Sequence, residues 1–174
     1  MKKASIRPRY LAQAAMVAAA YTVLTYLAAL PGLAYLPVQF RFSEALTILP
    51  AYLPAAVPGL TVGCLLGNLL SNYGAADMVF GTLATLLAAA LSRALRRFRV
   101  KGIPLLSFLP PVVVNGAVVG AEISFLAPGG FAWAEFWTTA LSVGGSELLV
   151  LAVLGLPLAV LIHKNKAVQK FLQP

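Results

Sequence analysis

Long stretches without a charged side chain are the feature that most constrains this chain. Four contain no Asp, Glu, Lys or Arg, and a fifth contains only Glu147; together they cover residues 11–36, 45–76, 78–92, 103–121 and 136–163. A helix needs roughly 20 apolar residues to cross about 30 Å of hydrocarbon. Only 10% of the 174 residues are charged, against about 25% in an ordinary soluble domain. The pattern predicts a single all-α transmembrane domain over residues 1–174, located in the cell membrane and in contact with membrane lipid.

Basic residues gather in three clusters, and their distribution predicts the topology. The clusters are Lys2, Lys3, Arg7 and Arg9; Arg93, Arg96, Arg97, Arg99 and Lys101; and Lys164, Lys166 and Lys170. They alternate with apolar runs, so the net charge of +8 indicates membrane orientation and not nucleic-acid binding. If all three clusters face the cytoplasm, an even number of crossings separates them. We therefore predict six transmembrane helices with cytoplasmic N- and C-termini.

The stretch 45–76 leaves two arrangements open. It is long for one helix and contains Pro50, Pro54 and Pro58, each of which removes a backbone donor. Two short helices that meet at a turn at Pro58-Gly59 would cross the membrane twice. A shallow re-entrant hairpin would not cross, yet it satisfies the same parity. We expect the two crossings.

Small residues recur at four-residue spacing in three of the predicted helices. They are Gly59, Gly63 and Gly67; Gly116 and Gly120; and Ala14 and Ala18, with Ala15 and Ala19 beside them. Small side chains let helix backbones approach closely in a membrane. We expect the glycine faces to pack within the chain. The alanine face fits either internal packing or the docking of a partner protein.

The five acids all fall in the predicted outer half or near the midplane. A carboxylate at the bilayer centre costs roughly 2.5–3.5 kcal/mol on insertion scales. Asp77 and Glu135 each fit a helix start, as a cap or beside the helix dipole, and Glu44 fits either a first turn or a site. Glu122 and Glu147 have no such explanation, so we predict that they bind a ligand or join a polar network.

Side-chain amides accompany these acids. Asn68 and Asn72 lie one helical turn apart, and Asn115 shares a helix face with Glu122. Intramembrane Asn ordinarily forms hydrogen bonds between helices, but its position beside acids favours a binding cavity. The aromatic residues predicted at the outer level fit an interfacial belt or a stacking platform; they are Tyr35, Phe40, Trp133 and Trp137.

Patterns of catalytic chemistry are missing from the sequence. It contains no Gly-rich phosphate loop, no cluster with metal-ligand spacing and no nucleophile paired with a histidine. The single histidine, His163, is predicted at the cytoplasmic side, far from the acids. We therefore expect no enzyme activity, no cofactor and no metal.

Several segments together resemble the QueT family of queuosine-precursor transporters. They are VQFRFSEALT (residues 38–47), PGLTVGC (58–64), DMVFGTLATL (77–86), PPVVVNG (110–116) and GSEL (145–148). The likeness covers nearly the whole chain. Members of this family are substrate-binding S-components of energy-coupling factor (ECF) importers.

The resemblance implies a fold, a partner and a pocket. The fold is an S-component-like bundle of six helices, with an outward-facing pocket covered by the loop at residues 31–41. The face of Ala14, Ala18, Ala15 and Ala19 would dock a transmembrane ECF coupling subunit that carries two ABC ATPases. This chain would supply no ATP site of its own.

The resemblance also implies a 7-deazaguanine ligand, whose adjacent N–H donors a carboxylate can accept. An aminomethyl precursor would bring a cation that explains a second acid. The cyano, aminomethyl and queuine forms all remain open. The predicted substrate-binding residues are Gln39, Arg41, Glu44, Asn68, Asn72, Asn115, Glu122 and Glu147.

Two other functions compete with this one. The first is an S-component of the same fold for another vitamin or a nucleobase. The second is a stand-alone proton-coupled carrier that uses Glu122 and Glu147 as relay groups. Ligand panels would separate the first from the proposed transporter, and uptake without ATPase subunits would identify the second.

Overall fold

The computed structural model describes residues 8–32, 34 and 40–172, and within them the chain is built from helices. Of the helices labelled η, η5 is a π-helix and the others are 3₁₀-helices. In chain order the helices are α1 (Pro8–Ala29), η1 (Phe42–Ala51), α2 (Ala56–Gly67), η2 (Asn68–Leu70), α3 (Ala75–Ala94), η3 (Leu95–Arg97), η4 (Leu105–Phe108), α4 (Leu109–Leu126), α5 (Trp133–Val150), η5 (Leu151–Gly155), α6 (Leu156–Lys164) and α7 (Lys166–Leu172).

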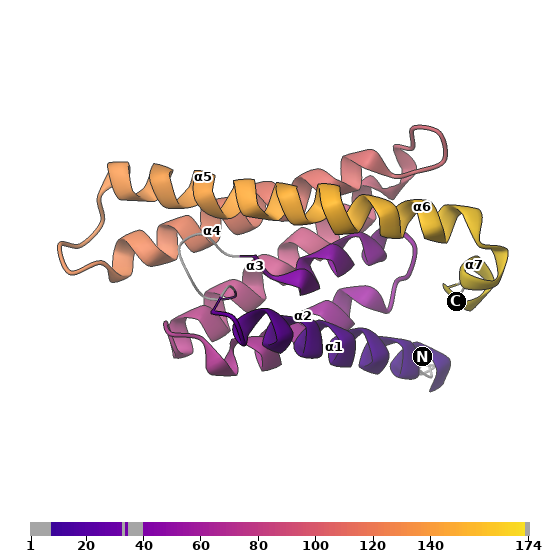
Figure 1. Ribbon diagram of the computed structural model, residues 1–174, viewed down its shortest axis with the longest axis horizontal. Coiled ribbons are helices and arrows are strands. Elements are labelled where there is room, and N and C mark those ends of the chain that lie inside the picture. The colour runs from indigo at the N-terminus through magenta and orange to yellow at the C-terminus, as the bar shows by residue number, and fades with distance from the viewer. Residues whose placement is uncertain (1–7, 33, 35–39, 173–174) are drawn as a thin grey trace, which may run out of the picture.

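Four helical segments among the described residues are long and apolar enough to cross a membrane. They are Pro8–Ala29, Ala75–Arg97, Leu105–Leu126 and Trp133–Lys164, of 22, 23, 22 and 32 residues. The last joins α5 to α6 through η5, where Pro157 follows the π turn and can donate no backbone hydrogen bond to it. Figure 1 shows these segments along the long axis, with both chain ends at the same end of the bundle.

The stretch 45–76 departs from the predicted pair of helices. Its first residues, 45–51, belong to η1, whose ten residues at about 2.0 Å rise span only about 20 Å. The break falls at residues 52–55, so the predicted turn at Pro58-Gly59 was wrong. Pro58 is the third residue of α2, a position whose backbone N–H has no partner within a helix, and proline therefore costs little there.

The directions of α1, η1 and α2 follow from their contacts. A Cβ added at Gly59 would lie 2.7 Å from the Ala14 carbonyl oxygen, and one added at Gly63 would lie 2.9 Å from that of Ala18. The contacts advance in the same order along both helices, so α1 and α2 are parallel. η1, which lies between them in the sequence, therefore runs in the opposite direction, as Figure 1 also shows. Both of the predicted arrangements, two crossings or a hairpin, require this reversal.

Glycine-mediated contact also joins α4 to α5. A Cβ at Gly116 would lie 2.9 Å from the Ala140 carbonyl oxygen, and one at Gly120 would lie 2.8 Å from the Ala140 Cβ. These distances exclude any larger residue unless the helices move apart. The prediction that both glycine faces pack within the chain is confirmed.

Apolar and polar side chains are distributed as in a protein embedded in a lipid bilayer. Many large apolar side chains point outward, including Met16, Leu83 and Leu141, while Gln13, Thr25 and Glu147 are buried. In water the reverse arrangement would be favourable. In hydrocarbon an apolar surface is favourable, and polar groups must form hydrogen bonds with each other inside the protein. The chain is therefore built for a membrane.

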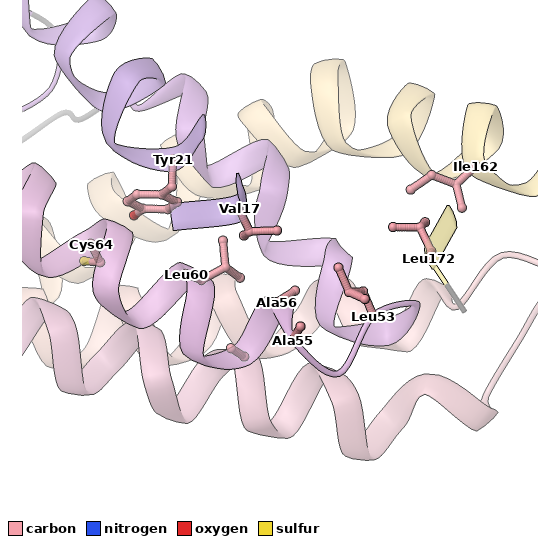
Figure 2. Packing of buried hydrophobic residues seen from close by; sticks show 10 residues of the cluster. Val17, Tyr21, Leu53, Ala55, Ala56, Leu60, Cys64, Ile162 and Leu172 are labelled. Atoms are coloured by element: carbon pink, nitrogen blue, oxygen red, sulfur yellow. The ribbon is translucent and has the colours of Figure 1, made fainter. Parts of the chain in front are cut away.

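An apolar cluster draws residues from α1, α2, α3, α6 and α7 and borders the polar region. Figure 2 shows Val17 against Leu60, with the Tyr21 ring near Cys64, as parts of one cluster of buried residues. Cys64 is a free cysteine buried in this cluster. The Tyr21 hydroxyl leaves the cluster and reaches a carboxylate, so this side chain joins the apolar core to the site described below.

The helix α7 binds back onto α1. Arg9 Nη2 donates to the carbonyl oxygens of Lys170 and Phe171, at 3.1 Å each. The amide of Gln13 donates to the same Phe171 oxygen at 2.7 Å. Because these carbonyls end a helix, they have no partner within it, and α1 supplies the donors.

Candidate functional site

A buried polar network begins at Arg41, directly before η1. Its Nε donates to the Ala34 carbonyl oxygen at 2.8 Å and its Nη1 to Asn68 Oδ1 at 3.0 Å. Its Nη2 lies 3.3 Å from Asp77 Oδ2, which makes a buried ion pair. Asn68 Nδ2 in turn donates to the Asp77 backbone oxygen at 2.9 Å. The network ties the segment before η1 to the end of α2 and the start of α3.

Asp77 plays a different part from the one predicted. The side chain lies in the first turn of α3, but the helix has no side-chain cap, and Gly74 occupies the N-cap position. Asp77 is 2% exposed and faces Arg41. The prediction of a simple cap was wrong because a buried guanidinium is a stronger partner for a carboxylate than a backbone N–H.

Glu44 lies one turn after Arg41 in η1 and is buried. The Tyr21 hydroxyl donates to its Oε1, while its Oε2 is buried and has no hydrogen-bond partner. Nearby, Thr25 Oγ1 donates to Ser43 Oγ at 2.8 Å, so η1 is attached to α1 through two adjacent residues. One oxygen of Glu44 is thus held in place and the other is left available.

Glu147 meets Glu44 from the opposite side. Its carboxyl group projects from α5, close enough to interact with the Glu44 carboxyl and with the Asn115 side chain. Its Oε1 is buried and has no partner. Two buried carboxylates side by side repel each other unless a proton or a cation joins them. The pair is therefore suited to a ligand that brings N–H donors or positive charge.

These groups line one small cavity of about 20 Å³. Its polar walls are Arg41, Glu44, Thr85, Asn115 and Glu147, and its apolar walls include Val119, Val143 and Val150. The volume suits one water molecule, whereas pockets for small organic ligands are about 300–1,000 Å³. A ligand would have to displace lining side chains to enter.

Glu122 is buried but does not line this cavity. It lies on α4 two turns beyond Asn115, and neither carboxylate oxygen has a hydrogen-bond partner. The nearest charges around it include Asp77, and both acids act on Tyr73 in the turn before α3. Burial, together with Asp77, Glu122 and Glu135, raises the pKa of Tyr73. Arg41 acts on Glu122 as well, so this acid lies beside the network of Arg41 and Asp77.

The remaining predicted site residues lie away from the cavity or outside the described residues. Asn72 is exposed in the turn between η2 and α3. Gln39 falls outside the described residues, as does Tyr35. Glu135 is partly exposed in the first turn of α5, as predicted.

The three predicted aromatic residues that the structure describes, Phe40, Trp133 and Trp137, do not line the cavity. Trp133 and Trp137 are exposed and pack beside Phe136 at the start of α5, while Phe40 is half-buried. An exposed cluster at a helix end fits an interfacial belt better than a platform for a ligand.

The alanine face of α1 is divided. Ala14 and Ala18 face the glycines of α2, and Ala18 is buried. Ala15 and Ala19 are exposed. Only the second pair is free of internal packing and able to meet a partner protein.

Tyr21 and Thr85 are not among the site residues predicted from the sequence, although both supply polar groups to the site. One signal was available, because each is a hydroxyl-bearing residue within an apolar helix that needs a buried partner. It could not have identified Glu44 as the partner of Tyr21.

Fold and site together define a helical membrane protein that encloses carboxylates in a polar chamber. The family model described as QueT transporter matches residues 11–164, which is most of the chain. The chain therefore belongs to the QueT transporter family. Comparison with curated proteins and with solved structures gave no match.

Proposed function

We propose that this chain is the S-component of an ECF importer and binds a 7-deazaguanine precursor of queuosine. Membership of the QueT transporter family supports a transport function. The partner would be a transmembrane coupling subunit with two ABC ATPases. The polypeptide would cross the membrane six times, with both termini in the cytoplasm, as the distribution of Lys and Arg predicts.

The observation that carries the proposal is the pair of buried carboxylates, Glu44 and Glu147. Each has an oxygen without a hydrogen-bond partner, and both line the same cavity. A 7-deazaguanine base presents adjacent N–H donors that fit one carboxylate, and an aminomethyl substituent presents a cation that fits the second. An anionic ligand would meet repulsion from both acids.

Neighbouring residues would orient this ligand. The Asn115 amide beside Glu147 offers a donor and an acceptor to the edge of the base. Val119, Val143 and Val150 offer apolar contact to the ring faces. Entry would require lining side chains to move, because the cavity of about 20 Å³ is too small for a base.

A ligand panel on the purified chain tests this proposal. The expected result is a rise in melting temperature with queuine or its cyano or aminomethyl precursors at micromolar concentration, because a ligand that binds only the folded state stabilises it. Guanine, adenine and folate serve as controls. Stabilisation by a different vitamin or nucleobase alone would instead identify another S-component specificity.

The Glu44–Glu147 pair also favours a second candidate function, a stand-alone carrier coupled to protons. Two buried acids that share a proton can release it when a cationic ligand arrives. Vesicles containing only this chain would then accumulate substrate in response to a pH gradient. An ECF S-component would accumulate it only with the ATPase subunits and ATP.

A further inference from the structure

A second cavity opens at the end of the bundle opposite the carboxylates. Its volume is about 500 Å³, and it lies between the end of η1, the end of α3 and the junction of α6 and α7. Arg93, Arg96 and Arg99 line it, together with His163 and Gln169. Among the described residues, no acid lines it. The transport site described above does not use any of these side chains.

The three arginines are held in place while keeping donors available. Arg93 Nη1 donates to the Pro50 oxygen at 3.2 Å, and Arg96 Nη1 to the Arg93 oxygen at 3.0 Å. Arg99 donates to backbone oxygens through Nε and Nη1. Each guanidinium carries five N–H donors, so every one of these side chains can still bind an anion.

Tyr52 gives the cavity a fixed wall. The Arg99 guanidinium carbon lies 5.6 Å from the centre of the Tyr52 ring, a distance at which the ring attracts a cation. Ala51, Ile162 and Leu172 add apolar surface to the cavity. The site therefore combines a cluster of positive charge with an apolar floor.

The positive charge is uncompensated within the described part of the chain. There, the single ion pair between side chains joins Arg41 to Asp77, at the other end of η1. Like charges gathered in one cavity repel each other and gain from an anion between them. The cavity is thus chemically suited to phosphate.

Apolar residues around the cavity indicate that it meets the membrane surface. The loop after α3 interleaves the arginines with Phe98 and Val100, both exposed, and Leu105 and Leu106 are exposed just beyond. Exposed apolar side chains beside arginines are typical of the boundary between headgroups and hydrocarbon. A ligand for this cavity can therefore arrive from the lipid.

We propose that this cavity binds the phosphodiester headgroup of an anionic phospholipid. The phosphate lies among Arg93, Arg96 and Arg99, whose planar guanidinium groups match its oxygens in pairs. The glycerol lies on the apolar floor. Anionic lipids are enriched in the cytoplasmic leaflet, and the basic clusters are predicted to lie on that side of the membrane.

The test uses the full chain in detergent and native mass spectrometry with added phosphatidylglycerol or phosphatidylcholine of identical acyl chains. Wild type should retain phosphatidylglycerol at least about fivefold more than phosphatidylcholine. Arg96→Gln and Arg99→Gln should each reduce its affinity roughly tenfold, the effect of one lost charge-assisted hydrogen bond. Arg97→Gln is the matched control, because Arg97 is exposed in the same segment and does not line the cavity.

Three outcomes would overturn the proposal. Equal loss in Arg97→Gln would mean that lipid responds to the charge of the whole loop and not to the cavity. Displacement of the lipid by millimolar inorganic phosphate would mean a site for a free anion. Unchanged lipid binding in Arg96→Gln and Arg99→Gln, with loss of the coupling subunit on purification, would mean a protein-docking site. Melting temperatures close to wild type establish that each variant is folded.

Discussion

Arg41 Nη2 lies 3.3 Å from Asp77 Oδ2, and this ion pair joins the residue before η1 to the first turn of α3 while both side chains are buried. Two charges withdrawn from water stabilise a fold only when each keeps its partner. Asn68 accompanies the pair with a bond to each residue. The geometry therefore makes the pair a structural support that joins the start of η1 to the end of α2 and the start of α3.

Replacing Asp77 with Asn should destabilise the protein strongly. The change removes the carboxylate charge that faces the buried Arg41 guanidinium, and breaking a buried ion pair costs about 3–5 kcal/mol. Thermal unfolding in detergent should show a large fall in melting temperature. Glu135→Gln removes a partly exposed acid and should change the stability by less than about 0.5 kcal/mol. If Asp77→Asn unfolds at the wild-type temperature, Arg41 does not depend on this partner.

Glu44→Gln and Glu147→Gln should weaken ligand binding most among the acids. Gln replaces one acceptor with a donor, so a base N–H then faces an N–H. Hydrogen bonds to charged groups are worth about 1.5–3 kcal/mol, which corresponds to roughly ten- to 150-fold in affinity. Isothermal titration calorimetry with the ligand found in the panel would measure the loss.

Glu122→Gln and Glu135→Gln serve as graded controls for that series. Glu122 is buried outside the cavity lining, so its replacement should weaken binding less than that of Glu147. Glu135→Gln should change affinity by less than about threefold, as exposed charges contribute little. Loss of binding in Glu135→Gln alone would put the pocket at the start of α5.

Gly63→Ala should destabilise the contact between α1 and α2. The new Cβ would lie 2.9 Å from the Ala18 oxygen and 2.8 Å from the Tyr21 Cβ, so the helices must separate. Overpacking of this kind costs about 1–3 kcal/mol. Gly145→Ala is the matched control, since a Cβ there meets nothing within 4 Å and alanine favours a helix. Similar melting temperatures for the two variants would refute close packing at Gly63.

Single cysteines should report the predicted topology. In a Cys64→Ala background, cysteines at the exposed positions Ala75 and Gly129 should react with a membrane-impermeant maleimide in intact cells. Cysteines at Lys101 and Lys166 should react only after the membrane is opened. External labelling at Lys101 would contradict a cytoplasmic loop between α3 and α4.

Replacing both Ala15 and Ala19 with Leu should prevent assembly with the coupling subunit. Both residues are exposed on α1, and bulky side chains would hold a partner helix away. Ligand binding should be unchanged. Ala90→Leu, at an exposed alanine on α3, is the control. Normal co-purification of the double variant would mean that this face contacts lipid only.

The long helices were predictable because the bilayer imposes a minimum length on any apolar run that crosses it. The runs at 11–36, 78–92, 103–121 and 136–163 each overlap one long helical segment. The form of η1 was not predictable, because a ten-residue 3₁₀-helix with Pro50 inside it has no distinctive sequence pattern. Its conformation depends on contacts with other helices, such as Thr25 with Ser43.

The candidate site was predictable by residue type but not by pairing. An acid within an apolar run is expensive, and that cost singled out Glu147 and Glu122. Nothing in the sequence relates Glu147 to Glu44, since they meet only when α5 packs against η1. The same holds for Asp77. Its position at a helix start suggests a cap, whereas in the fold its carboxylate pairs with Arg41.

The attachment of α7 to α1 has a consequence for the order of assembly in the cell. Arg9 and Gln13 are translated before every other helix, and the carbonyl groups that receive their bonds are translated after all of them. Gln13, which is 3% exposed in the finished structure, must therefore remain without this acceptor while α2 to α6 enter the membrane. An unpaired amide in hydrocarbon is costly, so α1 should stay near the aqueous surface or with an insertion factor until α7 has been synthesised. Closure of this contact would then follow the insertion of α2 to α6.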